Sequence, residues 1–250
     1  MVRFALEGKV RPGVVEQDVI REIRGSFLGR YRLTDVRHRL DEVKVLAPCQ
    51  PSKIVALALN YRAHVEEMKG RPPDEPSFFI KPSTAVIGPE DSIVYPKASK
   101  RVDYEGELGV IIGKRAKGVP QSEATSYILG YTCVNDVTAR DIQPKAGQFT
   151  RSKGFDTFAP MGPFIETELD AGNAWLETYL NGQLRQSSST SDLIFGVPKL
   201  IEYITEVMTL LPGDVIATGT PSGVGPMQPG DVVEVRIRGI GSLRNRVVAG

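Results

Sequence analysis

The chain has 250 residues, of which 41% are hydrophobic and 24% charged, and its formal net charge is +1. This balance excludes a disordered chain and a protein that coats nucleic acid, and the length suits one large domain or a main domain with an appendage. Cys49 and Cys133, the only cysteines, have neither the spacing of a zinc site nor that of a disulfide framework. The apolar runs are too short to span a bilayer, so we expect a cytoplasmic protein without membrane or nucleic-acid partners.

The first part of the chain, from Val2 to about Val45, alternates short apolar and charged stretches that are separated by turn-like breaks. This pattern predicts short strands. Residues 47–52 then contain two prolines, which disfavour both helix and strand. We therefore predict a small β-rich N-terminal domain over residues 1–50 and a main domain over residues 51–250.

The main domain is expected to consist mostly of strands. Runs rich in Val, Ile, Tyr and Thr predict strands over Ile54–Leu59, Arg101–Ile112, Ile128–Asn135, Trp175–Leu180, Val215–Thr218 and Val232–Ile237. Asn181-Gly182 predicts a hairpin, because a type I′ turn needs positive φ at both central residues.

Helices are the minority in this domain. Apolar residues at a spacing of three to four predict a helix over Pro198–Leu211, and a short helical stretch is expected over Tyr61–Met68. The Pro- and charge-rich residues 69–76 that follow predict a mobile segment. The expected fold class is therefore α+β and β-dominated.

Acidic residues suggest where the chemistry lies. Asp103, Glu105 and Glu107 alternate along one predicted strand, so they would project from the same face. This could be a solvated strand face, since acids are usually exposed, but such a cluster repels itself unless a cation offsets it. Asp136 follows the next apolar run. Together with Glu105 and Glu107 it would form an all-oxygen set, which selects Mg²⁺, Mn²⁺ or Ca²⁺ over zinc.

Four stretches now resemble, in order, the signature blocks of the fumarylacetoacetate hydrolase family. They read VDYEGELGVIIG, NDVTARDIQ, RSKGFDTFAPMGP and GDVIATGTPSGVGP, and the resemblance runs roughly from Lys53 to the C-terminus. It implies a mixed β-sandwich roll, usually in a homodimer. It also implies that Glu105, Glu107 and Asp136 hold the metal ion.

The resemblance implies roles for further residues as well. His64 and Glu67 match a His-x-x-Glu pair on a lid, and on a helical turn residues three apart are neighbours. The other matches are Lys153 beside the metal, Arg140 and Gln143 facing the substrate, and Thr220 near the substrate carboxylate. Without the resemblance, His64 reads as a surface residue, and the loop from Thr218 to Pro226 as a connecting turn that lacks a phosphate-binding motif.

The implied activity is that of a divalent-metal-dependent enzyme on a small 2-oxo acid, or its enolised 2-hydroxy form, through a metal-bound enolate. We favour hydrolysis of a C–C bond in an acylpyruvate or fumarylacetoacetate type of substrate, or decarboxylation, because His64 assisted by Glu67 could take a proton from water. Lys153 would stabilise charge or return the proton. Isomerisation of 2-hydroxyhepta-2,4-diene-1,7-dioate is the alternative within the enzymes. A non-catalytic scaffold that binds a metal or ligand is the alternative of another class.

Overall fold

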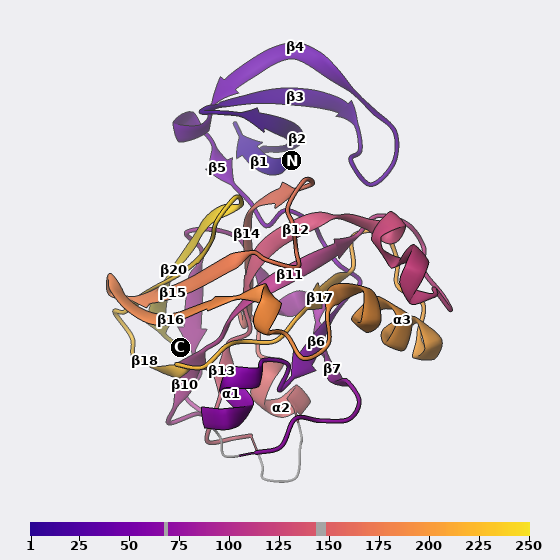
Figure 1. The fold of residues 1–250 in the computed structure, drawn as a ribbon. Helices are drawn as coiled ribbons and strands as arrows, with labels where there is room; N and C mark the ends of the chain where they lie inside the picture. Colours follow the sequence, from indigo (N-terminus) through magenta and orange to yellow (C-terminus); the bar gives the residue numbers. More distant parts are fainter. Residues whose placement is uncertain (68–69, 144–148) are drawn as a thin grey trace.

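The computed structural model describes residues 1–67, 70–143 and 149–250. Strands dominate these residues and lie in four sheets, with few helices (Figure 1). The predicted β-dominated α+β class is therefore confirmed. In the described part of the chain no helix combines the length and the apolar character needed to cross a membrane.

The first five strands form a sheet of their own, at the top of Figure 1, in the order β4-β3-β2-β1-β5. Its strands are β1 (Val2–Leu6), β2 (Lys9–Glu16), β3 (Val19–Gly25), β4 (Tyr31–Arg39) and β5 (Lys44–Val45), and η1 (Leu40–Glu42) precedes the last. Val2, Phe4 and Ile20 form its small core, whereas Ile23 and Phe27 pack against the rest of the molecule. Residues 46–52 contain no helix or strand.

A seven-stranded sheet forms the centre of the molecule, in the order β7-β6-β17-β11-β12-β14-β8. Its strands are β6 (Lys53–Ala58), β7 (Ser77–Pro82), β8 (Val86–Ile87), β11 (Gly106–Ile112), β12 (Ile128–Asn135), β14 (Ala159–Glu166) and β17 (Val215–Ala217). Both faces of this sheet are covered. On β6, Val55 and Leu57 belong to one buried cluster, and Ile54 and Ala56 to another. Burial on both faces explains why the strand is a continuous apolar run instead of an alternating one.

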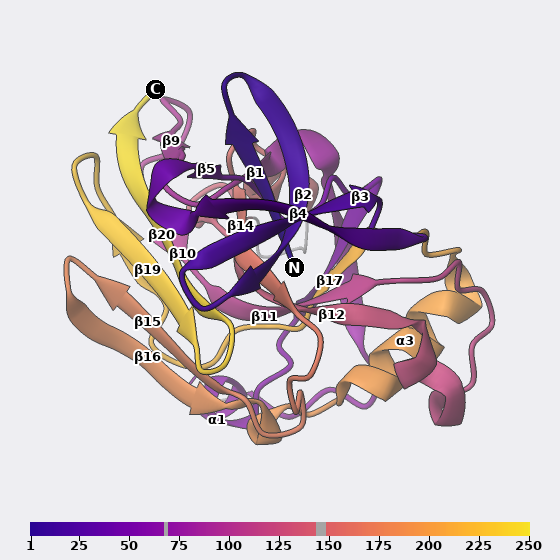
Figure 2. The same cartoon turned by 90° about the horizontal axis from the view of Figure 1, so that it is seen from above.

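Two further sheets pack around this centre. The five-stranded sheet β16-β15-β19-β20-β9 forms a curved layer (Figure 2), and a small sheet has the order β13-β10-β18. Their strands are β9 (Ser92–Tyr95), β10 (Val102–Tyr104), β13 (Thr138–Ala139), β15 (Trp175–Leu180), β16 (Gln183–Ser189), β18 (Gly225–Met227), β19 (Val232–Ile237) and β20 (Gly241–Ala249). Asn181 and Gly182 have φ values of 52° and 76°, which confirms the predicted hairpin turn between β15 and β16.

The helices are short. They are α1 (Arg62–Glu67), α2 (Phe149–Lys153), α3 (Val197–Val207) and the 3₁₀ turns η2 (Ser83–Ala85), η3 (Gln121–Tyr127) and η4 (Thr190–Asp192). The helix predicted over Pro198–Leu211 ends early, because Met208 is extended and Leu210 instead forms a bridge with Ala116. Met68 and Lys69, which follow α1, lie outside the described residues, and the mobility predicted for residues 69–76 remains a prediction.

Candidate active site

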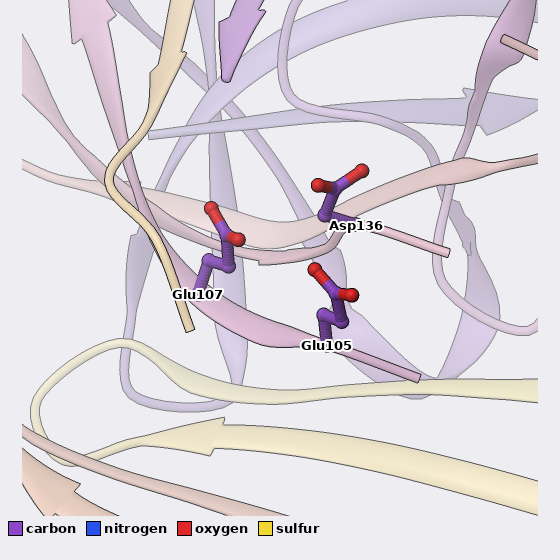
Figure 3. Close-up of side chains that lie close together, drawn as sticks. All are labelled: Glu105, Glu107 and Asp136. Atoms are coloured by element: carbon purple, nitrogen blue, oxygen red, sulfur yellow. The ribbon is translucent and has the colours of Figure 1, made fainter. Parts of the chain in front are cut away.

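Three carboxylates meet where strands of different sheets end. Glu105 lies in the break between β10 and β11, Glu107 on β11, and Asp136 directly after β12. The Asp136 N–H donates to the carbonyl of Glu105 at 2.8 Å, which fixes the two chain segments together. All three residues are buried, and one oxygen from each lies within 4.8 Å of the others (Figure 3). The convergence predicted for these three residues, which we call the carboxylate group, is therefore present.

Asp103, which the sequence predicts on the same strand face as Glu105 and Glu107, lies outside this group of three carboxylates. The predicted strand is broken at Glu105, where the chain passes from the three-stranded to the seven-stranded sheet, so the simple alternation is lost. The Asp103 carboxylate instead accepts hydrogen bonds from Nε of Arg101 and Nε of Arg140, each at 2.9 Å. Asp103 therefore anchors Arg140.

Two cations oppose Glu105. Lys153, at the end of α2, donates from Nζ to Glu105 Oε2 at 2.8 Å and to Asp136 Oδ2 at 2.6 Å. The guanidinium of Arg140 donates to Glu105 Oε1. Burial alone would raise the pKa of Glu105, but Lys153 and Arg140 outweigh it and lower this pKa to about 2. Burial also opposes the charge of Lys153, yet Asp136 and Glu105 outweigh it and raise the pKa of the ammonium.

Lys81 is a member of the site that the sequence reasoning missed. It lies on β7, and its ammonium contacts Asp136 Oδ1 and donates to the carbonyl of Val137 at 3.2 Å. Burial lowers the pKa of this lysine. In the sequence, Lys81 follows the apolar residues Phe78 to Ile80 and points to the same side as Phe79, but this pattern does not identify Asp136 as its partner.

Glu107 is the least satisfied of the three carboxylates. Its Oε2 accepts from the N–H of Gly219 at 2.9 Å, whereas its buried Oε1 has no hydrogen-bond partner in the described part of the chain. Burial, together with the charges of Asp136 and Glu105, raises its pKa well above the ordinary value. A buried oxygen without a partner, beside two other carboxylates, is suited to a cation, and the all-oxygen set fits Mg²⁺ or Mn²⁺.

A cavity of about 170 Å³ opens beside Glu105 and gathers most of the residues predicted for the site. Its wall is formed by Leu57, Ala58, Leu59, His64, Phe79, Glu105, Arg140, Gln143, Phe149, Lys153 and Thr220. The polar groups therefore face a wall of aliphatic and aromatic side chains. Phe79 and Phe149 stack with their ring centroids 4.6 Å apart, which gives this wall a flat aromatic part.

The predicted pair of His64 and Glu67 is formed on α1. His64 Nδ1 lies 3.1 Å from Glu67 Oε2, and the side chains are 12% and 47% exposed, respectively. When Nδ1 donates its proton to Glu67, Nε2 keeps a free lone pair. Since His64 lines the same cavity as Glu105 and Lys153, the imidazole and the carboxylate of Glu105 share one space.

Two of the residues predicted to bind substrate are held by the protein itself. The Thr220 hydroxyl donates to the carbonyl of Gly106 at 2.9 Å and accepts from Gln186 Nε2 at 2.8 Å. Gln143 Oε1 accepts from Arg140 Nη1 at 2.8 Å. Both residues line the cavity, and these internal hydrogen bonds hold them at its wall. Their contacts with a substrate remain predictions.

Asn60 links the start of α1 to the carboxylate group, and no sequence motif had singled it out. Its side-chain amide donates to the carbonyls of Thr218 and Phe195 at 2.8 and 3.1 Å, and its oxygen accepts from the Phe195 N–H. A Cβ added to Gly219 would lie 2.9 Å from the Cβ of Asn60. This close packing holds Gly219 where its N–H reaches Glu107.

Two family patterns and several known proteins are similar to this chain. The family pattern described as Fumarylacetoacetate (FAA) hydrolase C-terminal matches residues 53–248, and the pattern described as Rv2993c-like, N-terminal matches residues 1–48. The oxaloacetate tautomerase YisK of Bacillus subtilis is 41% identical over 225 residues, which cover 84% of this chain and 75% of that protein.

Two solved structures resemble the whole chain. The 5-carboxymethyl-2-hydroxymuconate delta-isomerase from Mycobacterium smegmatis is 45% identical with a TM-score of 0.94, and covers 100% of this chain and 99% of its own. The fumarylacetoacetate hydrolase from Exiguobacterium antarcticum is 38% identical with a TM-score of 0.90, and covers the same shares, 100% and 99%. The family pattern spans the segments that supply the carboxylate group and its cavity. This chain belongs to the fumarylacetoacetate hydrolase family.

Proposed function

We propose that this chain is a divalent-metal-dependent enzyme that acts on a small 2-oxo acid by C–C bond hydrolysis or decarboxylation. The observation that carries the proposal is the buried group of Glu105, Glu107 and Asp136, whose oxygens lie within 4.8 Å of one another. Mg²⁺ or Mn²⁺ bound there would supply the positive charge that stabilises an enolate oxygen.

The cationic side chains around the group support an anionic substrate. Lys153 and Arg140 both line the cavity and both donate to Glu105. Asp136 and Glu105 raise the pKa of Lys153, which favours its charged form, and Lys153 lies where it can bind a substrate oxygen or return a proton to carbon. The apolar wall of Leu57 and the stacked Phe79 and Phe149 suits the rest of a small acid.

His64 supports the hydrolytic version of the reaction. With Nδ1 bonded to Glu67, its Nε2 can take a proton from water as the water attacks the distal carbonyl. The C–C bond then breaks, the two electrons of that bond pass to the 2-oxo acid fragment, and a proton returns to its carbon. Decarboxylation uses the same electron flow but needs no water, so a variant without His64 distinguishes the two reactions.

Isomerisation or tautomerisation is the second candidate, and the names of the relatives favour it. A relative 41% identical is called an oxaloacetate tautomerase, and a structure 45% identical is called a delta-isomerase. These reactions move a proton between carbon and oxygen without breaking a C–C bond. They require an acid or base such as Lys153 at the carboxylate group but no attacking water.

Product analysis decides between these candidates. The purified protein with Mg²⁺ is incubated with acetylpyruvate, oxaloacetate and 2-hydroxyhepta-2,4-diene-1,7-dioate, and the products are followed by proton NMR. We expect acetate and pyruvate from the first or pyruvate and carbon dioxide from the second, and a loss of hydrolysis in His64→Asn. Proton exchange or isomerised product without cleavage would overturn the hydrolase and decarboxylase assignment in favour of the second candidate.

We also propose that the chain forms a homodimer, as the resemblance to the family implies. Light scattering coupled to size-exclusion chromatography measures this directly. A mass near twice the 27.3 kDa of one chain is expected, and a mass of one chain at micromolar concentration would contradict it.

A further inference from the structure

Two buried lysines share one carboxylate in this site. Among the residues that the structure describes, Lys81 and Lys153 are the lysines with buried side chains. Both ammonium groups reach Asp136, Lys81 at Oδ1 and Lys153 at Oδ2. Lys153 is shared with Glu105, whereas the ion pair of Lys81 is with Asp136, so the two lysines are expected to have different tasks.

Their surroundings separate these tasks. Lys153 lines the cavity and links Asp136 to Glu105, so it stands among the carboxylates on the side from which a substrate arrives. Lys81 comes from β7, is absent from the cavity wall, and makes its second hydrogen bond to the backbone carbonyl of Val137. Lys81 therefore binds Asp136 from outside the cavity wall, and within the described residues its hydrogen bonds go to Asp136 and Val137 and not to Glu105 or Glu107.

The strand itself is built to place this lysine inside. On β7 the side chain of Ile80 is exposed, at 42%, whereas Lys81 is buried, at 1%. A strand selected only for packing would have the reverse order, because burying an ammonium group costs several kcal/mol before its partners are counted. A buried lysine next to an exposed isoleucine breaks the usual pattern of burial, and such exceptions are expected at functional sites.

We infer that Lys81 is a positioning residue for the metal centre, an inference that rests on the proposed function. By fixing Asp136 Oδ1, Lys81 keeps the carboxylate in the orientation in which Oδ2 accepts from Lys153, which also binds Glu105. The ammonium of Lys81 also donates to the Val137 carbonyl, which fixes its position. The Asp136 carboxylate is therefore bound by an ammonium group that cannot move freely. Outer partners of ligating carboxylates commonly change metal affinity by about 10- to 100-fold when they are removed.

The test is the Mn²⁺ dissociation constant of the folded protein, measured by electron paramagnetic resonance. Lys81→Met removes the donor, and Lys81→Gln keeps a shorter, uncharged one. The matched control is Lys53→Met, because Lys53 lies on the neighbouring strand β6 and pairs with buried Asp214 instead of the metal centre. We expect about 10- to 100-fold weaker Mn²⁺ binding in a Lys81 variant and no change in the control.

An unchanged Mn²⁺ dissociation constant in a folded Lys81 variant overturns the inference, and so does equal weakening in Lys53→Met. If neither Lys81 variant folds, a crystal structure of the unaltered protein with Mn²⁺ decides. The inference is supported if Asp136 coordinates the ion and Lys81 donates to Asp136. It is refuted if Lys81 points away from Asp136. Failure of the unaltered protein to bind Mn²⁺ would be a different result, because it overturns the proposed function itself.

Discussion

Glu107→Gln is the substitution that probes the proposed metal centre most directly, because Gln keeps the shape of the side chain and removes only its charge. In the metal-free protein the pKa of Glu107 is raised above its ordinary value of 4.5 by burial and by Asp136 and Glu105. Its stabilising contribution is therefore complete below that ordinary value and is lost as the pH rises through the higher folded pKa. Gln cannot ionise, so we expect the metal-free variant to lose less stability towards alkaline pH than the unaltered protein.

In the presence of a divalent cation, we expect Glu107→Gln to be less stable than the unaltered protein. Two unit charges 4 Å apart interact by about 4 kcal/mol at an effective dielectric constant of about 20, which is the scale of the attraction that Gln loses. That loss corresponds to a roughly thousand-fold weaker Mg²⁺ affinity. At a Mg²⁺ concentration about 100 times its dissociation constant, the unaltered protein gains about 2.7 kcal/mol. For a chain of this size the gain raises Tm by roughly 5–10 °C, and the variant should gain almost nothing.

Differential scanning calorimetry with and without Mg²⁺, supported by titration calorimetry, measures both effects. Glu16→Gln is the matched control, because Glu16 is exposed on β2, far along the chain from the carboxylate group. If Glu107→Gln binds Mg²⁺ as tightly as the unaltered protein and shows the same rise in Tm, then Glu105, Glu107 and Asp136 do not form the metal site.

Three further outcomes are expected. His64→Asn should lower the rate of hydrolytic turnover by about 10²- to 10⁴-fold and leave the Mn²⁺ affinity unchanged. Steady-state kinetics and metal titration measure the two quantities. An equal loss of turnover and of Mn²⁺ affinity would refute the role of His64 as a base. Lys153→Met should destabilise the metal-free protein by about 3–5 kcal/mol in urea denaturation, because it leaves buried carboxylates unpaired. Mg²⁺ should restore part of this loss. An unchanged denaturation midpoint without metal would contradict the charge argument. Gly219→Ala should weaken Mg²⁺ binding and lower Tm, because its Cβ would lie 2.9 Å from the Cβ of Asn60. Gly230→Ala is its control, since Gly230 has a similar φ of 101° but no atom within 4 Å of an added Cβ, and equal effects of the two substitutions would rule out the clash.

Much of the fold was predictable from local pattern. The apolar runs of β6, β11 and β12 and the Asn181-Gly182 turn lie where the sequence predicts them, because each depends on neighbouring residues in the chain. The end of α3 was not predictable in this way. Leu210 leaves the helical pattern to pair with Ala116, a contact between residues far apart in sequence.

For the site, the residue types and their spacing determined that Glu105, Glu107 and Asp136 could form an oxygen-only group. The tertiary structure decided what the neighbouring Asp103 does. The break in the strand at Glu105 directs Asp103 to Arg101 and Arg140 instead of the group. Spacing gives the face of a side chain only while one regular element continues, so it could not anticipate the partners of Asp103.

The sequence by itself determined the β-rich class, the resemblance to the family and the candidate carboxylates, because these depend on composition, periodicity and short motifs. The tertiary structure alone decided that Lys81 binds Asp136 and that Asn60 packs on Gly219. The physical reason is that electrostatic and packing energies act over a few ångströms of space and are indifferent to separation along the chain. A lysine 55 residues away from its partner carries no mark of that partner in the sequence.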